Sequence, residues 1–231
     1  MRITLVTIRV PANPMYDSVT KRWIETYVKF KPKTEHELIV VDSDKAGDPG
    51  PFADHATRFV TYKGGGWDCG IWEYAGENFD TDLLICCNSS TYFWKDGWME
   101  RFVSEVEKNG VGLYGSMASL EYFPHLRTPC LVFQPEVIRR YPLLVNCREK
   151  TYAFECLAGK ENFTMWCARN GYTPRLVTWD GCYEIADWRK PPNIFRRGDQ
   201  SNILVKDRHV DTYEASSPEG KVALENMADH L

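Results

Sequence analysis

The chain is long enough to bury one sizeable core, and its composition excludes several classes of protein. Of its 231 residues, 43% are hydrophobic and 26% are charged, so the chain is not expected to be disordered. The net charge of -4 excludes a general attraction to polyanions, and no apolar run is long enough to cross a membrane. Because the N-terminus also lacks the apolar core of a secretory signal, we expect a cytoplasmic protein.

The eight cysteines form no Cys-x-x-Cys pair and have no spacing typical of a zinc site. In a cytoplasmic protein such residues are reduced and fill core space, so we assign them no function. Cys86 and Cys87 lie within one apolar run. If this run is a strand, their side chains point to opposite faces of a sheet.

The first half of the chain alternates strands with helices. Short β-branched or apolar runs predict buried strands at residues 3–8, 38–41, 58–62, 83–87 and 111–115. Apolar residues at helical spacing predict helices at residues 18–30, 68–75 and 95–108. Continuous apolar strands that alternate with helices indicate an α/β protein with a mostly parallel central sheet, flanked by helices on both faces.

The second half of the chain is less regular. It predicts strands at residues 131–133 and 175–178, and helices at residues 135–141 and 161–170. Residues 179–207 are predicted to be a loop, and a polar terminal helix is predicted after Ser216. Because no repeat or interdomain linker interrupts the chain, we expect a single domain over residues 1–231.

Acidic and polar residues occur at the two ends of the predicted strands. Asp42 and Asp44 follow the second strand, and Asn88-Ser89-Ser90 follows the fourth. Ligands of a parallel sheet bind beyond the carboxyl ends of its strands, so these residues belong to the active edge. Asp80 and Asp82 form a literal Asp-x-Asp, but they precede the fourth strand. We therefore interpret them as a solvated turn at the opposite edge.

A glycine-rich turn leads into the second predicted helix, with the sequence Gly64-Gly65-Gly66-Trp67-Asp68. Glycines allow close approach of a ligand to the backbone, and the start of the following helix favours anions. The turn lacks the Gly-Lys-Ser/Thr ending of a phosphate-binding loop. Asp68 is either a ligand-binding residue or only the N-cap of this helix.

The order of these elements resembles the glycosyltransferase A fold. The resemblance extends through residues 110–115, 128–137 and 161–172, and it covers most of the chain up to about residue 213. It implies a Rossmann-like, nucleotide-sugar-binding half at residues 1–116. It further implies a less regular acceptor and catalytic half at residues 117–215, and a terminal helix or tail at residues 216–231.

The resemblance also implies a set of donor-binding residues. The acid after the second strand holds the nucleotide base or ribose in that fold, so we assign this function to Asp42, with Asp44 as the second candidate. Asp68 is expected close to the nucleotide, and Asn88 and Ser90 are expected to hydrogen-bond to ribose or phosphate. The donor itself is expected to be a nucleoside diphosphate sugar, with uridine as the nucleoside.

The expected metal motif is where the chain departs from the family. The family places Asp-x-Asp after the fourth strand, where it holds a divalent cation, Mn²⁺ or Mg²⁺, that bridges the diphosphate. This chain has Asn88-Ser89-Ser90 there, and neutral oxygens bind such ions weakly. The resemblance makes His209 a ligand of the metal or the diphosphate. Arg208 and Lys206 lie nearby in the sequence and are able to neutralise the leaving diphosphate.

Glu161-Asn162 resembles the acidic pair that starts a helix in inverting members of the family. There the acid is the general base that takes the proton from the acceptor hydroxyl. This makes Glu161 the catalytic candidate. Its alternative interpretation is a first-turn glutamate that the helix dipole stabilises. If the transferase hypothesis is correct, Asp42, Asn88 and Glu161 converge around one cleft.

Two hypotheses for function follow. The first is a glycosyltransferase that acts on an acceptor hydroxyl, either in a polysaccharide precursor or in a hydroxymethylated base of phage DNA. The second is a non-catalytic module that binds a sugar or nucleotide on the same fold. Residues 188–197 contain four cations with interleaved aromatics. They form either a lid or nucleic-acid contact, or an exposed loop whose cations pair with surface acids.

Overall fold

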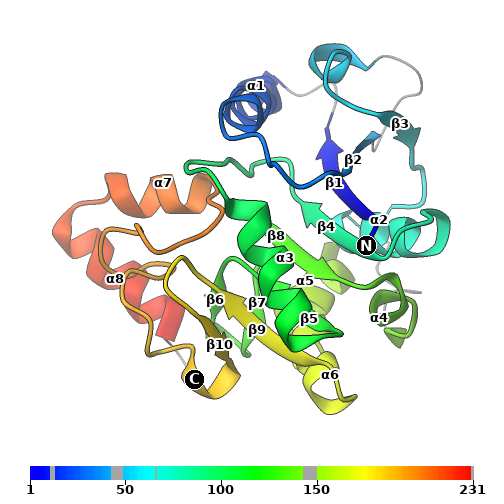
Figure 1. Cartoon of the computed structure of the whole chain (residues 1–231). Coiled ribbons are helices and arrows are strands. Elements are labelled where there is room, and N and C mark those ends of the chain that lie inside the picture. Colours follow the sequence, from blue (N-terminus) through cyan, green and yellow to red (C-terminus); the bar gives the residue numbers. More distant parts are fainter. Residues whose placement is uncertain (11–13, 43–48, 66, 143–149, 230–231) are drawn as a thin grey trace.

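The computed structural model describes residues 1–10, 14–42, 49–65, 67–142 and 150–229. The strands of its main sheet are β1 (Ile3–Arg9), β2 (Glu37–Asp42), β3 (Arg58–Thr61), β4 (Leu83–Cys87), β5 (Gly112–Gly115), β8 (Cys130–Phe133), β9 (Thr173–Val177) and β10 (Cys182–Glu184). They pair in the order β10-β9-β5-β8-β4-β1-β2-β3 (Figure 1). Strands β6 (Ala118–Ser119) and β7 (His125–Leu126) form a separate hairpin.

The main sheet is mostly parallel, as predicted. β1 is parallel to β2 and β4, β2 is parallel to β3, and β5 is parallel to β9. β8 is antiparallel to both β4 and β5, and β10 is antiparallel to β9. Because β8 runs against its neighbours, the residues just before it lie at the edge where β1, β2 and β4 end.

Helices cover both faces of the sheet. They are α1 (Pro14–Lys29), α2 (Trp67–Asn78), α3 (Trp98–Asn109), α4 (Pro135–Arg139), α5 (Lys150–Ala158), α6 (Phe163–Arg169), α7 (Arg208–Ala215) and α8 (Pro218–Asp229). Side chains of α1 and α3 pack in one buried cluster, and side chains of α2, α4, α5 and α6 pack in another. In Figure 1, α3 lies in front of the sheet and α5 lies behind it.

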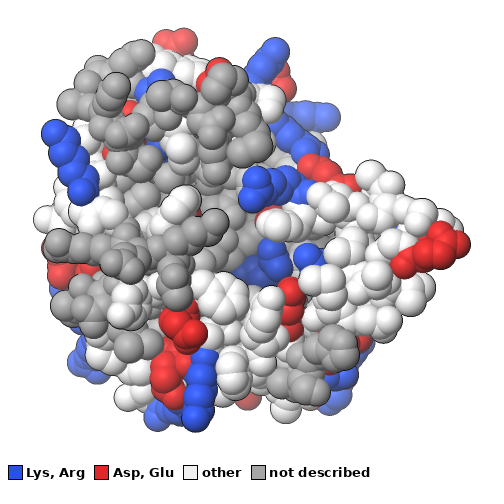
Figure 2. Space-filling view, turned by 180° about the vertical axis from the view of Figure 1, so that it is seen from behind, with Lys and Arg blue, Asp and Glu red and all other residues white. Residues whose placement is uncertain are grey.

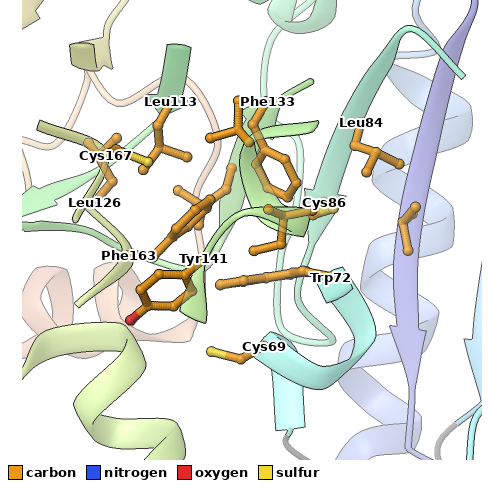
Figure 3. Close-up of a cluster of buried hydrophobic side chains, with 14 of the residues drawn as sticks. Cys69, Trp72, Leu84, Cys86, Leu113, Leu126, Phe133, Tyr141, Phe163 and Cys167 are labelled. Atoms are coloured by element: carbon orange, nitrogen blue, oxygen red, sulfur yellow. The ribbon is translucent and has the colours of Figure 1, made fainter. Parts of the chain in front are cut away.

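The two clusters arise from the alternation of side chains along the buried strands. Cys86 packs on the side of Trp72 from α2 and Phe163 from α6 (Figure 3). Its neighbour Cys87 packs in the opposite cluster, with Trp98 of α3. The expectation that these two cysteines face opposite sides of the sheet is therefore confirmed.

The expectation that all cysteines are reduced needs one correction. The free cysteines of the described chain are Cys69, Cys86, Cys87, Cys130, Cys167 and Cys182. Cys156, in α5, is disulfide-bonded. Sequence spacing did not indicate this bond because no Cys-x-x-Cys or similar motif surrounds the residue.

Several elements differ from the sequence prediction. The helix predicted from residue 95 begins at Trp98, because Gly97 precedes it with a left-handed φ of 84°. The predicted loop at residues 179–207 contains β10. Helices α5 and α7 were not predicted, and α7 has only 8 residues, of which just Val210 and Tyr213 are buried. So short an amphipathic pattern gives a weak periodic signal.

Candidate functional site

A cleft of about 290 Å³ lies at the carboxyl edge of the sheet, where β1 and β4 end and where α2 and α7 begin. Five of the residues predicted from the sequence line it: Asp68, Asn88, Ser90, Arg208 and His209. Seen from behind the view of Figure 1, the molecule is hollowed near the middle of the face, and Lys and Arg side chains gather in and beside the hollow (Figure 2). A cleft is thus present at the edge that the rule for parallel sheets selects.

Asn88 organises the turn at the tip of β4. Its Oδ1 accepts hydrogen bonds from the backbone N and the Oγ of Ser90, at 2.9 and 3.1 Å, and from Thr91 Oγ1 at 3.1 Å. Its Nδ2 donates to Thr128 Oγ1 at 3.0 Å. The carboxamide is therefore engaged by the protein at both ends, and its first task is to hold this turn.

Asp68 lies in the first turn of α2, one residue after the helix begins, and not at the cap position. Its carboxyl accepts a hydrogen bond from the Thr128 side chain, and burial raises its pKa to about 6. Thr128 thus connects Asn88 to Asp68 across the cleft. A carboxyl group that titrates near neutral pH in a cleft is a common feature of functional sites.

Arg127 is a cleft residue that sequence reasoning missed. Its guanidinium carbon lies 4.0 Å from the centre of the Phe195 ring, and its buried Nε has no hydrogen-bond partner. Within the described residues, no carboxylate forms an ion pair with it. Arg127 and Thr128 precede β8, which is antiparallel, so the rule that selects residues after strands does not find them.

The start of α7 forms the opposite wall of the cleft. Asp207 is almost fully buried, and its Oδ1 caps the helix by accepting from the backbone N of His209 at 2.9 Å and of Val210 at 3.3 Å. Arg208 is exposed, and no ion pair joins it to any residue of the described ranges. Burial lowers the pKa of His209, which favours its neutral form at pH 7. Lys206, by contrast, is paired with Glu214 at 3.0 Å.

Trp67 stands at the cleft with an exposed fraction of 58%. Its φ is 53°, a left-handed conformation that is unusual for a bulky residue. A strained, exposed aromatic residue beside a cleft is a candidate for stacking on a planar ligand. Its only signal in the sequence is weak, namely its position directly after the glycine-rich turn.

Two further predicted residues lie elsewhere, and Asp44 lies outside the described residues. Asp42 ends β2 at the carboxyl edge, but its Oδ2 pairs with Arg9 Nη1 at 3.8 Å and it does not line the cleft. Glu161 is about half exposed, pairs with Arg169 at 2.5 Å and does not line the cleft either. Of the trio expected to converge, only Asn88 lines it, so the expected convergence is wrong: Asp42 and Glu161 each pair with an arginine outside the cleft. A transferase function therefore has to rest on the residues that do line the cleft.

The residue after Glu161 has a structural function. Asn162 is fully buried and caps α6, because its Oδ1 accepts from the backbone N of Met165 at 2.9 Å. Its Nδ2 donates to the backbone oxygens of Gly159 and Pro124, at 2.7 and 3.2 Å. The helix predicted from residue 161 thus begins at Phe163 with Asn162 as its cap, so Glu161 precedes the helix and is not a first-turn glutamate.

His125, on β7, lines a second cavity of about 140 Å³ that also includes Arg127 and Thr128. Its Nδ1 donates to the backbone oxygen of Phe123 at 2.8 Å, and burial lowers its pKa to about 4. The imidazole is therefore neutral at pH 7, and Nε2 is its basic atom. Since Arg127 and Thr128 line both spaces, this cavity adjoins the main cleft.

The predicted basic loop at residues 188–197 uses its cations internally. Each of the four contacts an acid or a carbonyl group: Arg189 the Asp229 oxygen, Lys190 the Asp187 carboxylate, Arg196 the Glu121 carboxylate and Arg197 the Asp229 carboxylate. Of the two interpretations left open by the sequence, the pairing of the cations matches the second, but the segment is not an exposed loop throughout, because Trp188, Phe195 and Arg196 are buried. No helix of the described chain is long and apolar enough to cross a membrane.

No protein-family model matches the sequence, and no curated protein matches it. Solved structures do resemble it. A mannosyltransferase from Pyrobaculum calidifontis, in complex with GDP-mannose and Mn²⁺, is similar with a TM-score of 0.52 and 13% identity over 74% of this chain and 53% of that chain. Mouse xyloside xylosyltransferase 1 is similar with a TM-score of 0.52 and 8% identity over 77% of this chain and 85% of that chain.

The chain spans only part of some of these proteins. It covers 30% of Staphylococcus aureus TarS, to which it is similar with 12% identity and a TM-score of 0.43. At these identities the similarity establishes the fold alone. The protein therefore has the glycosyltransferase A-type fold, a mixed α/β fold with a large central sheet flanked by helices.

Proposed function

We propose that this protein is a glycosyltransferase that moves a sugar from a nucleoside diphosphate sugar to an acceptor hydroxyl. The observation that carries the proposal is the cleft at the carboxyl edge of a glycosyltransferase A-type fold, lined by Arg127, Arg208 and His209. Guanidinium groups bind phosphate oxygens through paired, charge-assisted hydrogen bonds. The start of α7 adds the positive end of a helix dipole to the same wall.

The proposed orientation of the donor follows from the charges and the exposed aromatic residue of the cleft. The diphosphate lies between Arg127 and the start of α7, and the base lies toward Trp67, where a planar ring is available for stacking. Asp42 remains the proposed partner of the base or ribose because it lies at the same edge, at the end of β2. Ser90 remains a proposed hydrogen-bond donor to the ribose or phosphate.

The proposed reaction forms one bond and breaks one bond at the anomeric carbon of the sugar. The acceptor oxygen bonds to the anomeric carbon, the bond from that carbon to the diphosphate oxygen breaks, and its electron pair leaves with the diphosphate. A base takes the proton of the acceptor hydroxyl. Cations of the cleft stabilise the negative charge that develops on the leaving group.

Two residues are candidates for the base. Glu161 is the candidate implied by the family resemblance, and it would have to exchange its pair with Arg169 for the acceptor. His125 is the candidate favoured by position, because its cavity adjoins the cleft. Its imidazole is neutral at pH 7 and is therefore able to accept a proton. Loss of a general base typically lowers kcat by about 100-fold or more. Comparing kcat for Glu161→Gln and His125→Gln decides between them, with Glu136→Gln, an exposed glutamate in the first turn of α4, as the control.

Donor identity is tested by thermal unfolding with single nucleotides. The uridine proposal expects uridine diphosphate to raise the melting temperature and adenosine diphosphate to leave it unchanged, because a specific ligand stabilises only the native state. Guanosine diphosphate is the necessary third sample, since the Pyrobaculum mannosyltransferase binds GDP-mannose. A shift with guanosine diphosphate alone would replace uridine by guanosine and leave sugar transfer in place.

The acceptor is proposed at the level of a hydroxyl group, in a polysaccharide precursor or in modified DNA. DNA has the weaker support, because the cations of residues 188–197 are engaged within the protein. Binding of double-stranded DNA weakens steeply with salt when several phosphates are neutralised. A salt titration of DNA binding therefore separates the two acceptors, and a flat response excludes DNA.

A further inference from the structure

The tip of β4 is a poor place for a divalent cation in this protein. Mn²⁺ and Mg²⁺ prefer carboxylate oxygens, and this tip offers Asn88, Ser89 and Ser90 instead. The Asn88 carboxamide oxygen already accepts three hydrogen bonds within its own turn. No group of three His, Cys, Asp or Glu side chains is arranged to hold a metal ion anywhere in the described ranges. The donor set therefore does not fit the cation that the fold family uses.

Arg127 has the properties of a permanent positive charge held ready for an anion. Its position is fixed from both ends, by the backbone hydrogen bond from its N to the Met117 oxygen at 2.9 Å and by stacking of its guanidinium on Phe195. Its Nε is buried and has no partner. Burying a charged donor without a partner is costly, so a protein retains such a group where a ligand completes it.

The carboxylates of the cleft do not cancel this charge. Asp207 lies close enough to influence Arg127 electrostatically, but its Oδ1 is engaged in capping α7. Asp68 contacts Thr128, on the α2 side of the cleft. Arg208 adds a second guanidinium that no described carboxylate pairs with. Arg127 and Arg208 thus line a cleft whose described carboxylates, Asp68 and Asp207, form no ion pair with either guanidinium group.

We propose that Arg127, together with Arg208, neutralises the diphosphate of the donor in place of a divalent cation, and that donor binding needs no metal. This inference rests on the proposed transferase function. As the bond between the anomeric carbon and the diphosphate oxygen breaks, the electron pair moves to that oxygen. The guanidinium groups then stabilise its negative charge through N–H donors that are already in place.

The test is a calorimetric titration of the whole chain with uridine diphosphate, guanosine diphosphate and inorganic pyrophosphate. Each is titrated once in excess EDTA and once with MnCl₂. The inference expects binding in EDTA and little change on adding Mn²⁺. It also expects Arg127→Met and Arg208→Ala each to weaken pyrophosphate binding by about 10- to 100-fold, the usual effect of losing a hydrogen bond to a charged group.

Two controls keep the test decisive. Arg2→Ala removes an exposed arginine at the opposite edge of the sheet and should leave binding unchanged. If Arg127→Met fails to fold, as judged by circular dichroism, Arg208→Ala alone carries the test, because Arg208 is exposed. Lysine at position 127 should restore part of the affinity, since it keeps the charge but not the planar fork.

The outcomes separate this inference from the function on which it rests. Binding that appears only with Mn²⁺, or that is unaffected by both arginine variants, overturns the inference and leaves the transferase proposal standing. Absence of binding for all three ligands under both conditions overturns both.

Discussion

The two ends of the central sheet each carry a hollow, and they differ in what their charges do. The hollow at the amino edge is the larger, at about 490 Å³ against about 290 Å³. Its arginine is exposed and paired: Arg2 bridges to Asp80 and, at 3.2 Å, to Asp82. At the carboxyl edge, Arg127 and Arg208 have no carboxylate partner among the described residues. The two hollows therefore differ in the pairing of their arginines as well as in size.

The same contrast bears on the Asp-x-Asp sequence at the amino edge. The side chain of Asp80 is 87% exposed, and Asp82 accepts a hydrogen bond from the backbone N of Arg2 at 2.7 Å. Both acids lie where β4 begins, as predicted from their place before the strand. Solvent-exposed carboxylates and arginines that pair with one another contribute little to the stability of the fold. Their charges are already balanced, so they attract a ligand weakly.

The largest expected effect is on catalysis, from Arg208→Ala. This change removes a donor to the developing charge, and the loss of one such group typically lowers kcat by about 100- to 1000-fold. Steady-state kinetics with the preferred donor measure the effect. The matched change at the other edge, Arg2→Ala, should leave kcat/KM unchanged. Equal kcat/KM values for Arg208→Ala and Arg2→Ala would show that the two edges do not differ in function.

Next in size is the effect of Asn88→Ala on stability. The variant loses the hydrogen bonds to Ser90, Thr91 and Thr128, so the free energy of unfolding should fall by about 3 kcal/mol. Urea denaturation measures it. Ser89→Ala is the control, because no hydrogen bond involves this hydroxyl in the described structure. If the two variants are equally stable, Asn88 does not organise the turn.

A smaller, pH-dependent effect is expected from Asp68→Asn. The folded protein raises the pKa of Asp68 from 3.8 to about 6, so the native state binds this proton more tightly than the unfolded state. The wild-type protein therefore loses stability as the pH rises from about 4 through 6. The Asn variant avoids this loss and should be more stable by about 2 kcal/mol at pH 8, a value reduced for partial exposure.

The measurement is the difference in unfolding free energy between Asp68→Asn and the wild type at pH 4 and at pH 8. The difference should be near zero at pH 4 and should grow with pH. A difference that is the same at both values would mean that Asp68 keeps an ordinary pKa and is not buried in a cleft.

The smallest effect is expected at the amino edge, from Asp80→Ala. The ion pair with Arg2 is fully accessible to solvent, so its loss should leave the melting temperature unchanged within the error of the measurement. Added salt should change the melting temperatures of Asp80→Ala and of the wild type equally. A clear destabilisation would show that this edge is more than a solvated turn.

Much of the first half could be predicted from the sequence, and less of the site. The strands around Val6, Val40 and Ile85 are continuous and apolar because they are buried on both faces, and this pattern is unambiguous in sequence. The edge rule then selects Asn88, which lines the cleft at the carboxyl edge. It overlooks Arg127 because β8 is antiparallel, and strand direction is set by pairing between distant segments.

Several elements of the second half could not be predicted from the sequence, for related reasons. Helices α5 and α7 have 9 and 8 residues, too few for a clear periodic signal. The family resemblance suggested a position for Glu161 but not its partner, since the pair with Arg169 depends on side-chain geometry at the surface. The kinetic comparison of Glu161→Gln with His125→Gln decides which of these two residues is the base.

The most direct test of the account is a crystal structure of the protein with uridine diphosphate or guanosine diphosphate, grown without divalent cations. The account predicts the diphosphate in the carboxyl-edge cleft, with its oxygens hydrogen-bonded to the guanidinium groups of Arg127 and Arg208. A nucleotide bound at the amino edge, or at any site that neither arginine reaches, would contradict it.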